Sequence, residues 1–130
     1  MSKVNKSYVR KGRKYKPEEV FDKVPLVKGK RKERVDFDGD LIKITSDRLF
    51  VFRDNLCCVM CGIKGSFFIK ERCQEHKAYH FNLYAEVNGE EILMTKDHIV
   101  PRSKGGPDRV SNYQTMCTIC NGEKKDTLVT

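Results

Sequence analysis

Residues 95–106 read TKDHIVPRSKGG, and residues 117–125 read CTICNGEKK. The first stretch places an Asp-His pair ahead of a loop rich in proline and glycine, and the second follows a cysteine pair directly with Asn121. A carboxylate beside an imidazole can divide cation binding and proton transfer between two side chains. Alone, such a pair is a weak signal, because it also occurs by coincidence on protein surfaces. Its weight depends on what the rest of the chain contains.

Two C-x-x-C pairs, Cys58 with Cys61 and Cys117 with Cys120, predict a structural zinc site. Two intervening residues let both thiolates of a pair bind one ion in tetrahedral geometry. The stretch between the pairs, residues 62–116, is longer than in a usual zinc ribbon, which predicts an insertion between the two halves. Cys57 could replace Cys58 as a ligand, although the C-x-x-C spacing is the more common one.

Three further residues of metal-binding type lie between the cysteine pairs. We expect Cys73 to be a free thiol and His76 and His80 to be structural or surface residues. The histidines are four residues apart, but they fall where a loop is predicted to run into a strand.

The net charge of +8 is concentrated in the first quarter of the chain. Residues 1–34 contain 13 of the 26 Lys and Arg residues but 4 of the 18 Asp and Glu residues. A basic tail on a nearly neutral body is typical of proteins that bind polyanions. The sequence therefore predicts a basic, partly disordered DNA-binding arm over 1–34 and a folded domain over 35–130, with order beginning near Val35. A solubilising tail without a partner is the alternative.

Hydropathy predicts no signal peptide and no membrane-spanning segment, so we expect a cytoplasmic protein without a membrane partner. In a reducing compartment, paired cysteines are more often metal ligands than disulfides.

Local patterns predict a mixed α+β chain. A hairpin is expected at Asp38-Gly39 and another at Asn88-Gly89, because such dipeptides favour tight turns. The expected helices cover 17–24, 46–55 with Ser46 as cap, and 118–126. The expected strands cover 35–45 (with its turn), 66–70, 78–87, 91–99 and 112–116.

Taken together, DHIVPRSKGG, Asn112 and CTICNGEKK resemble the HNH endonucleases, in the zinc-bound subgroup with paired C-x-x-C motifs. The chain is similar above all to small HNH proteins of bacteriophages. This resemblance implies a ββα-metal (His-Me finger) fold, in which two strands and a helix surround one divalent cation. Residues 62–95 would be an added β-hairpin insertion.

The resemblance also implies roles for individual residues. His98 matches the general base, Asp97 and Asn121 match the ligands of a catalytic Mg²⁺ or Mn²⁺, and Asn112 matches the residue that fixes the loop. The structural Zn²⁺ would bind the four cysteines of the two pairs. Arg102 and Lys104 could lie along the phosphates.

The implied activity is hydrolysis of DNA phosphodiester bonds by a homing-type phage endonuclease, as a nick or a double-strand break. The protein would act as a monomer or weak dimer. The alternative is a zinc-stapled nucleic-acid-binding module without catalysis.

Overall fold

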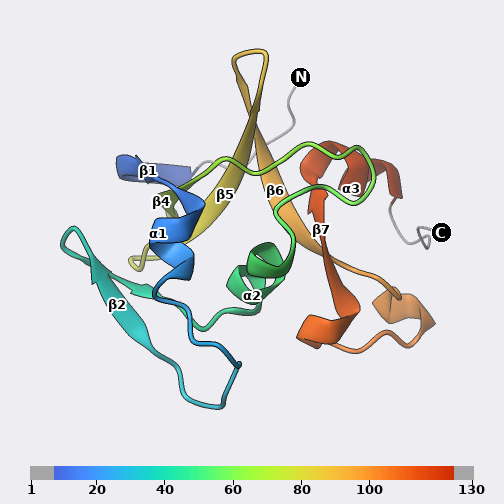
Figure 1. Ribbon diagram of the computed structural model, residues 1–130, viewed down its shortest axis with the longest axis horizontal. Helices are drawn as coiled ribbons and strands as arrows, with labels where there is room; N and C mark the ends of the chain where they lie inside the picture. Colours follow the sequence, from blue (N-terminus) through green and yellow to red (C-terminus); the bar gives the residue numbers. More distant parts are fainter. Residues whose placement is uncertain (1–7, 125–130) are drawn as a thin grey trace.

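A five-stranded antiparallel sheet runs through the middle of the molecule (Figure 1). The computed structural model describes residues 8–124. In order across the sheet, the strands are β1 (Tyr8–Tyr15), β4 (Phe67–Cys73), β5 (His80–Val87), β6 (Glu90–His98) and β7 (Tyr113–Cys117). Strands from the N-terminal and C-terminal parts of the chain therefore share one sheet.

A separate hairpin and three helices pack around this sheet. The hairpin consists of β2 (Arg34–Phe37) and β3 (Asp40–Lys43), and the helices are α1 (Pro17–Phe21), α2 (Asp47–Asp54) and α3 (Thr118–Lys124). Two short 3-10 helices, η1 (Arg102–Lys104) and η2 (Val110–Asn112), lie in the loop between β6 and β7. Within residues 8–124, no helix is long and apolar enough to cross a membrane. The mixed class predicted from the sequence is confirmed.

Both predicted tight turns are present. Asp38 and Gly39 have φ angles of 54° and 98°, and Asn88 and Gly89 have φ angles of 51° and 82°. Two central residues with positive φ define the type I′ turn, whose twist matches that of the flanking strands. These turns fix the register of the β2–β3 hairpin and of the β5–β6 hairpin.

The N-terminal segment forms an edge strand, so the expectation that order begins near Val35 is wrong. β1 pairs with β4 from Tyr8 opposite Cys73 to Lys11 opposite Lys70. All four of its cations are paired with carboxylates, in the pairs Arg10 with Glu71 and Glu91, Lys11 with Asp40, Arg13 with Glu19 and Asp38, and Lys14 with Glu86 and Glu91. The segment is too charged to fold alone, and it is ordered because the sheet supplies hydrogen-bond partners and opposite charges.

The segment expected to be an added hairpin insertion, residues 62–95, forms the centre of the sheet. It contains β4 and β5 together with most of β6. Phe68 on β4 and Leu83 on β5 are both completely buried. The prediction of an appended hairpin is therefore wrong, because these strands supply part of the central core.

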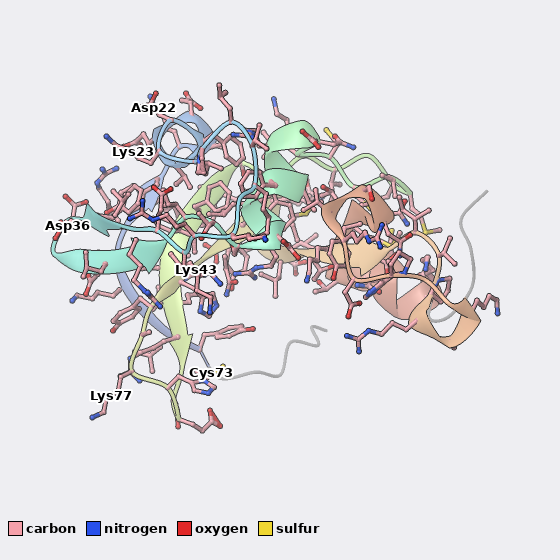
Figure 2. All side chains as sticks on the ribbon, turned by 90° about the horizontal axis from the view of Figure 1, so that it is seen from below. Asp22, Lys23, Asp36, Lys43, Cys73 and Lys77 are labelled. Carbon is pink, nitrogen blue, oxygen red and sulfur yellow. The ribbon has the colours of Figure 1, made fainter. Side chains whose placement is uncertain are left out.

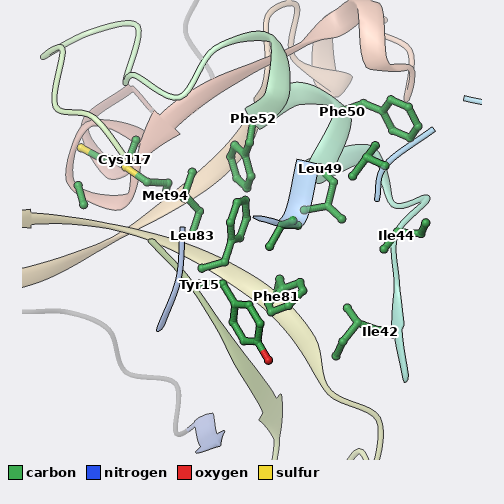
Figure 3. Close-up of a cluster of buried hydrophobic side chains, with 14 of the residues drawn as sticks. Tyr15, Ile42, Ile44, Leu49, Phe50, Phe52, Phe81, Leu83, Met94 and Cys117 are labelled. Atoms are coloured by element: carbon green, nitrogen blue, oxygen red, sulfur yellow. The ribbon is translucent and has the colours of Figure 1, made fainter. Parts of the chain in front are cut away.

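The main core joins the β2–β3 hairpin, α2 and the sheet (Figure 3). Aromatic rings meet edge to face in its centre, with ring centroids 4.9 Å apart for Phe37 and Phe81 and 5.2 Å apart for Tyr15 and Phe81. Such pairs contribute about 0.5–1.5 kcal/mol beyond the burial of their area. At the left of Figure 3, Met94 and Cys117 connect this core to the cysteine cluster.

One buried carboxylate, that of Glu71, ties β1 to the middle of the sheet. Its Oε2 accepts a hydrogen bond from Arg10 (2.8 Å), and its Oε1 accepts from Asn82 and from the Tyr84 hydroxyl (both 2.7 Å). Burial and the bond to Glu71 raise the pKa of the Tyr84 hydroxyl well above its ordinary value, so this hydroxyl remains a donor. A fully partnered network of this kind specifies where the edge strand docks.

Candidate metal centre and active site

Four cysteines from two distant segments meet at the end of β7, where α3 begins. The Sγ atoms of Cys58, Cys61, Cys117 and Cys120 all lie within 4.8 Å of one another, and those of Cys61 and Cys117 are 3.9 Å apart. Tetrahedral binding at about 2.3 Å per sulfur would separate the sulfurs by about 3.8 Å. The donor set and its spacing therefore fit Zn²⁺.

Backbone hydrogen bonds hold the first cysteine pair, Cys58 and Cys61, in place as a tight turn (a zinc knuckle). The Gly62 amide donates to the carbonyl of Cys58 (2.9 Å), and Gly62 takes a φ of 83° to close the turn. The Val59 amide donates to the carbonyl of Thr115 on β7 (3.0 Å), which joins the two knuckles. Burial opposes ionisation of Cys58, but donors from Cys61, Cys117 and Met60 lower its pKa to about 7. A thiolate at this position is the form that binds a metal.

The structure selects between the two possible cysteine registers. Cys58 belongs to the cluster, whereas Cys57 forms an isolated bridge with Lys64 and lies outside it.

A second group of metal-binding side chains lies at the tip of the β4–β5 connection. Ligand atoms of Cys73, Glu75 and His76 lie within 4.8 Å of one another, with Glu75 and His76 exposed. Figure 2 shows this turn, marked by Cys73 and Lys77, projecting away from the core. His80 lies elsewhere, at the start of β5, where its ring contacts Tyr8 edge to face.

Asp97 is held inside the β6–β7 hairpin. It is 9% exposed, lies opposite Gln114 on β7, and accepts a hydrogen bond from the Gln114 amide at Oδ2 (3.2 Å). The ammonium group of Lys124 on α3 lies 3.2 Å from the same oxygen. Lys124 is buried as well, and its Nζ also donates to the carbonyl of His98 (3.3 Å). The carboxylate is thereby fixed and its charge compensated.

His98 ends β6 and is partnered by an acid from the following loop. Its Nε2 lies 2.7 Å from Oδ1 of Asp108, and its ring meets Tyr113 edge to face with centroids 4.9 Å apart. Arg102 donates to both carboxylate oxygens of Asp108, at 3.0 and 2.7 Å. The Arg102 guanidinium and His98 hold the pKa of Asp108 well below its ordinary value, so Asp108 is ionised at neutral pH.

Asn112 fixes the loop that follows His98. Its Oδ1 accepts from the amide of Val100 (3.0 Å), and its Nδ2 donates to the carbonyls of Val100 (3.1 Å) and Pro107 (2.9 Å). Its own carbonyl accepts from the amide of Ile99 (2.8 Å). The buried side chain thus binds both the beginning and the end of the loop.

Asn121 lies on the first turn of α3 and faces β6. Its Nδ2 donates to Oγ1 of Thr95 at 2.9 Å. Thr95 and Asp97 are two residues apart on β6 and point to the same face. Asn121 and Lys124 are three residues apart on α3 and share a side of the helix. The helix therefore presents an amide to Thr95 and an ammonium group to Asp97.

The comparisons with known proteins concern the unit formed by β6, β7 and α3. Residues 86–130 match the family model described as HNH endonuclease. These residues are similar to HNH endonucleases, and we refer to them as the HNH segment. Comparison with curated proteins and comparison with solved structures gave no match.

The HNH segment contains partners that the sequence analysis does not predict. Asp108, Gln114 and Lys124 contact His98 or Asp97 directly. Strand register identifies Gln114, because it lies opposite Asp97 in the hairpin. Lys124 lies within the CTICNGEKK motif, but its contact with Asp97, like that of Asp108 with His98, depends on how α3 and the loop fold back.

A catalytic cation in the HNH segment would have few protein ligands. Apart from the four-cysteine cluster and the Cys73 group, residues 8–124 contain no group of three His, Cys, Asp or Glu side chains arranged for one ion. A single carboxylate with one amide oxygen suits Mg²⁺, which keeps several waters and binds substrate phosphates. Asp97 and Asn121 have this donor chemistry.

Proposed function

We propose that the protein is a divalent-metal-dependent endonuclease that hydrolyses DNA phosphodiester bonds. The observation that carries the proposal is the HNH match over residues 86–130, in which Asn112 holds the loop directly after the Asp97-His98 pair. DNA is the substrate that this family implies, and the excess of cations in the chain agrees with a polyanionic substrate.

In this proposal His98 is the general base. Its imidazole accepts a proton from the attacking water, and Asp108 orients the ring through Nε2. Asn112 keeps the loop backbone in one conformation, so that the imidazole is presented at the end of β6. The products would carry a 5′-phosphate and a 3′-hydroxyl.

Asp97 and Asn121 are the proposed cation ligands. The contacts of Gln114 and Lys124 are made to Oδ2 of Asp97, so Oδ1 is the oxygen proposed for the cation. The Asn121 amide donates through Nδ2, and its Oδ1 is the second proposed ligand. A bound Mg²⁺ or Mn²⁺ would polarise the scissile phosphate and stabilise the leaving 3′ oxygen.

A plasmid-nicking assay with Mg²⁺ or Mn²⁺ tests the proposal. His98→Ala should reduce cleavage by about 10²- to 10⁴-fold, the usual contribution of a general base. His76→Ala, which changes an exposed histidine in the β4–β5 connection, is the matched control and should cleave like the parent. Equal cleavage by the parent and His98→Ala would remove His98 from the mechanism.

A nucleic-acid-binding module without catalysis is the second candidate, and one observation favours it. Both proposed catalytic groups have internal partners, Asp108 for His98 and Lys124 for Asp97. Strong DNA binding by the parent, with no cleavage under Mg²⁺, Mn²⁺ or Zn²⁺, would support this candidate over the nuclease.

We also propose the homing-type phage role that the resemblance implies. Cleavage sites mapped on a whole phage genome would test it, because a homing-type enzyme should cut at one or a few positions. Cuts spread over the genome would instead indicate general DNA degradation.

A further inference from the structure

One arginine on α2 binds the backbone of the segment between α1 and β2. The guanidinium of Arg53 on α2 donates to the carbonyls of Pro25 (2.8 Å) and Val24 (3.3 Å) through Nη1 and of Leu26 (3.0 Å) through Nη2. Val24 is buried in the core. The backbone of this segment is therefore fixed although it contains no helix or strand.

Two aliphatic side chains project from this fixed backbone into solvent. Leu26 is 89% exposed and Val27 is 77% exposed, more than any other large hydrophobic residue within 8–124. Isolated exposed aliphatic residues need no explanation. A fixed adjacent pair directly followed by a run of cations indicates a surface that contacts a partner.

The cations that follow are not neutralised as those of β1 are. Residues 28–34 read KGKRKER, five cations and one acid, and Lys28 is paired with Asp47 (3.1 Å). Within residues 8–124, no ion pair is found for four of these cations, Lys30, Arg31, Lys32 and Arg34.

Lys43, opposite Arg34 in the hairpin, adds a further cation to this surface. Burial and then the nearby Lys32, Lys28 and Arg34 lower the pKa of Lys43, so like charges gather here. A surface that concentrates repelling cations is complementary to a row of phosphates.

This surface and the HNH loop open at the same end of the molecule. Figure 1 shows residues 24–33 and residues 99–112 at that end, on either side of α2. α2 connects them physically, because Arg53 binds the first segment and the Asn55 carbonyl accepts from Thr115 on β7 (2.5 Å). The residue before Thr115, Gln114, contacts Asp97. A duplex at the HNH loop could therefore extend to the basic segment.

We propose that residues 26–34 with Lys43 form a second DNA contact, in which the cations bind phosphates and Leu26 and Val27 enter the minor groove as a wedge between base pairs. This deepens the proposed function and rests on DNA being the substrate. Leucine is one of the residues that architectural proteins insert between base steps, where it unstacks and kinks the duplex. The wedge would deform DNA beside the cleavage site, so that deformable sequences are preferred.

Unwinding of closed circular DNA tests the wedge without knowledge of the target sequence. The zinc-loaded full chain carrying His98→Ala, without added Mg²⁺, is bound to relaxed plasmid, and a type IB topoisomerase then relaxes the complex. The shift in linking number should be lost when Leu26→Ser and Val27→Ser are added and retained with Leu26→Met. An unchanged shift with the serine pair would overturn the wedge.

Salt dependence tests the phosphate contacts separately. Replacing Lys30, Arg31 and Lys32 by alanine should lower the slope of log affinity against log salt by about 2 to 3, since each phosphate contact contributes about 0.9. The matched control replaces the exposed Lys23, Lys64 and Lys77 by alanine and should leave the slope unchanged. Equal slopes for both triple variants would overturn the phosphate contact.

Both measurements use DNA binding without cleavage, so they do not depend on catalysis. If the parent binds and unwinds DNA but never cuts it, the second contact stands and the nuclease proposal fails. If the parent cuts DNA but the serine pair unwinds it equally well, the wedge fails and the nuclease proposal stands. Binding to anionic lipid vesicles through Leu26 and Val27, with no DNA binding, would overturn the inference. Zinc content and thermal melting establish that each variant is folded.

Discussion

At the scale of single residues, Gly106 determines the path of the loop after His98. A Cβ at this position would lie 1.7 Å from the carbonyl oxygen of Val100 and 2.9 Å from the Asn112 amide nitrogen. The first contact is with backbone, which cannot move aside without breaking the hydrogen bonds of Asn112 to Val100.

We therefore predict that Gly106→Ala displaces the loop and reduces cleavage about 100-fold, the cost typical of a displacement of about 1 Å in a catalytic group. Plasmid nicking measures this effect, and zinc content should stay at the parent level. Gly122→Ala is the control, because a Cβ there meets nothing within 4 Å. It lies within α3 and should stabilise the protein by up to about 1 kcal/mol. Full activity in Gly106→Ala would contradict the proposed role of the loop.

At the scale of elements, the β2–β3 hairpin is attached to the sheet by a buried ion pair. Lys70 on β4 is 1% exposed, and its Nζ lies 2.7 Å from Oδ2 of Asp40 and 2.8 Å from the carbonyl oxygen of Phe37. Lys11 binds the other oxygen of the same carboxylate at 3.0 Å, but its side chain is 51% exposed. The two lysines thus offer a matched comparison around one acid.

We predict that Lys70→Ala lowers the free energy of unfolding by about 1–3 kcal/mol, since it removes a buried ammonium group and leaves the carbonyl of Phe37 without its donor. Lys11→Ala should cost at most about 1 kcal/mol, as is usual for exposed ion pairs. Urea unfolding followed by circular dichroism measures both. Equal losses in the two variants would show that burial does not determine the strength of this attachment.

The start of β5 makes stability depend on pH through His80. Burial, followed by the Arg48 guanidinium, lowers the pKa of His80, while Glu71 and Asn82 oppose this shift and His76 adds to it. Because the unfolded chain binds a proton at an ordinary histidine pKa of about 6.5 and the folded chain binds it less readily, stability is lost as pH falls below about 6.5.

When pH falls from 7.5 to 5.5, we predict that the free energy of unfolding decreases less for His80→Gln than for the parent. The measurement is urea unfolding at both pH values. His76→Gln changes an exposed histidine that contributes least to the shift of the His80 pKa, so it should lose nearly as much as the parent. An identical loss in His80→Gln and the parent would show that His80 is not the group responsible.

At the scale of the whole molecule, the cysteine cluster joins the segment after α2 to the end of the HNH segment. Cys58 and Cys117 are buried beside the core, so the metal site and the hydrophobic core are continuous. Structural zinc sites contribute directly to folding, and their removal commonly unfolds small domains.

We predict that Cys58→Ser loses the zinc of this cluster and lowers the thermal midpoint strongly, whereas Cys57→Ser changes neither. Metal analysis by mass spectrometry and thermal melting provide the two readouts. Loss of the same zinc from Cys57→Ser would mean that the ligand register in solution is C-x-x-x-C.

The sequence by itself determined the elements whose signals are local. The type I′ turns follow from Asp38-Gly39 and Asn88-Gly89. Cysteine spacing also predicted which four thiols meet, because two residues between ligands restrict the geometry of each knuckle.

Only the tertiary structure decided where distant segments pair. The charge of β1 predicted a free arm, but Arg10 and Lys14 are balanced by carboxylates more than 50 residues away, those of Glu71 and Glu86. Likewise, Asp108 reaches His98 and Lys124 reaches Asp97 because a loop and a helix fold back onto β6. Pairing between segments depends on the three-dimensional path of the chain, and composition and periodicity carry no record of that path.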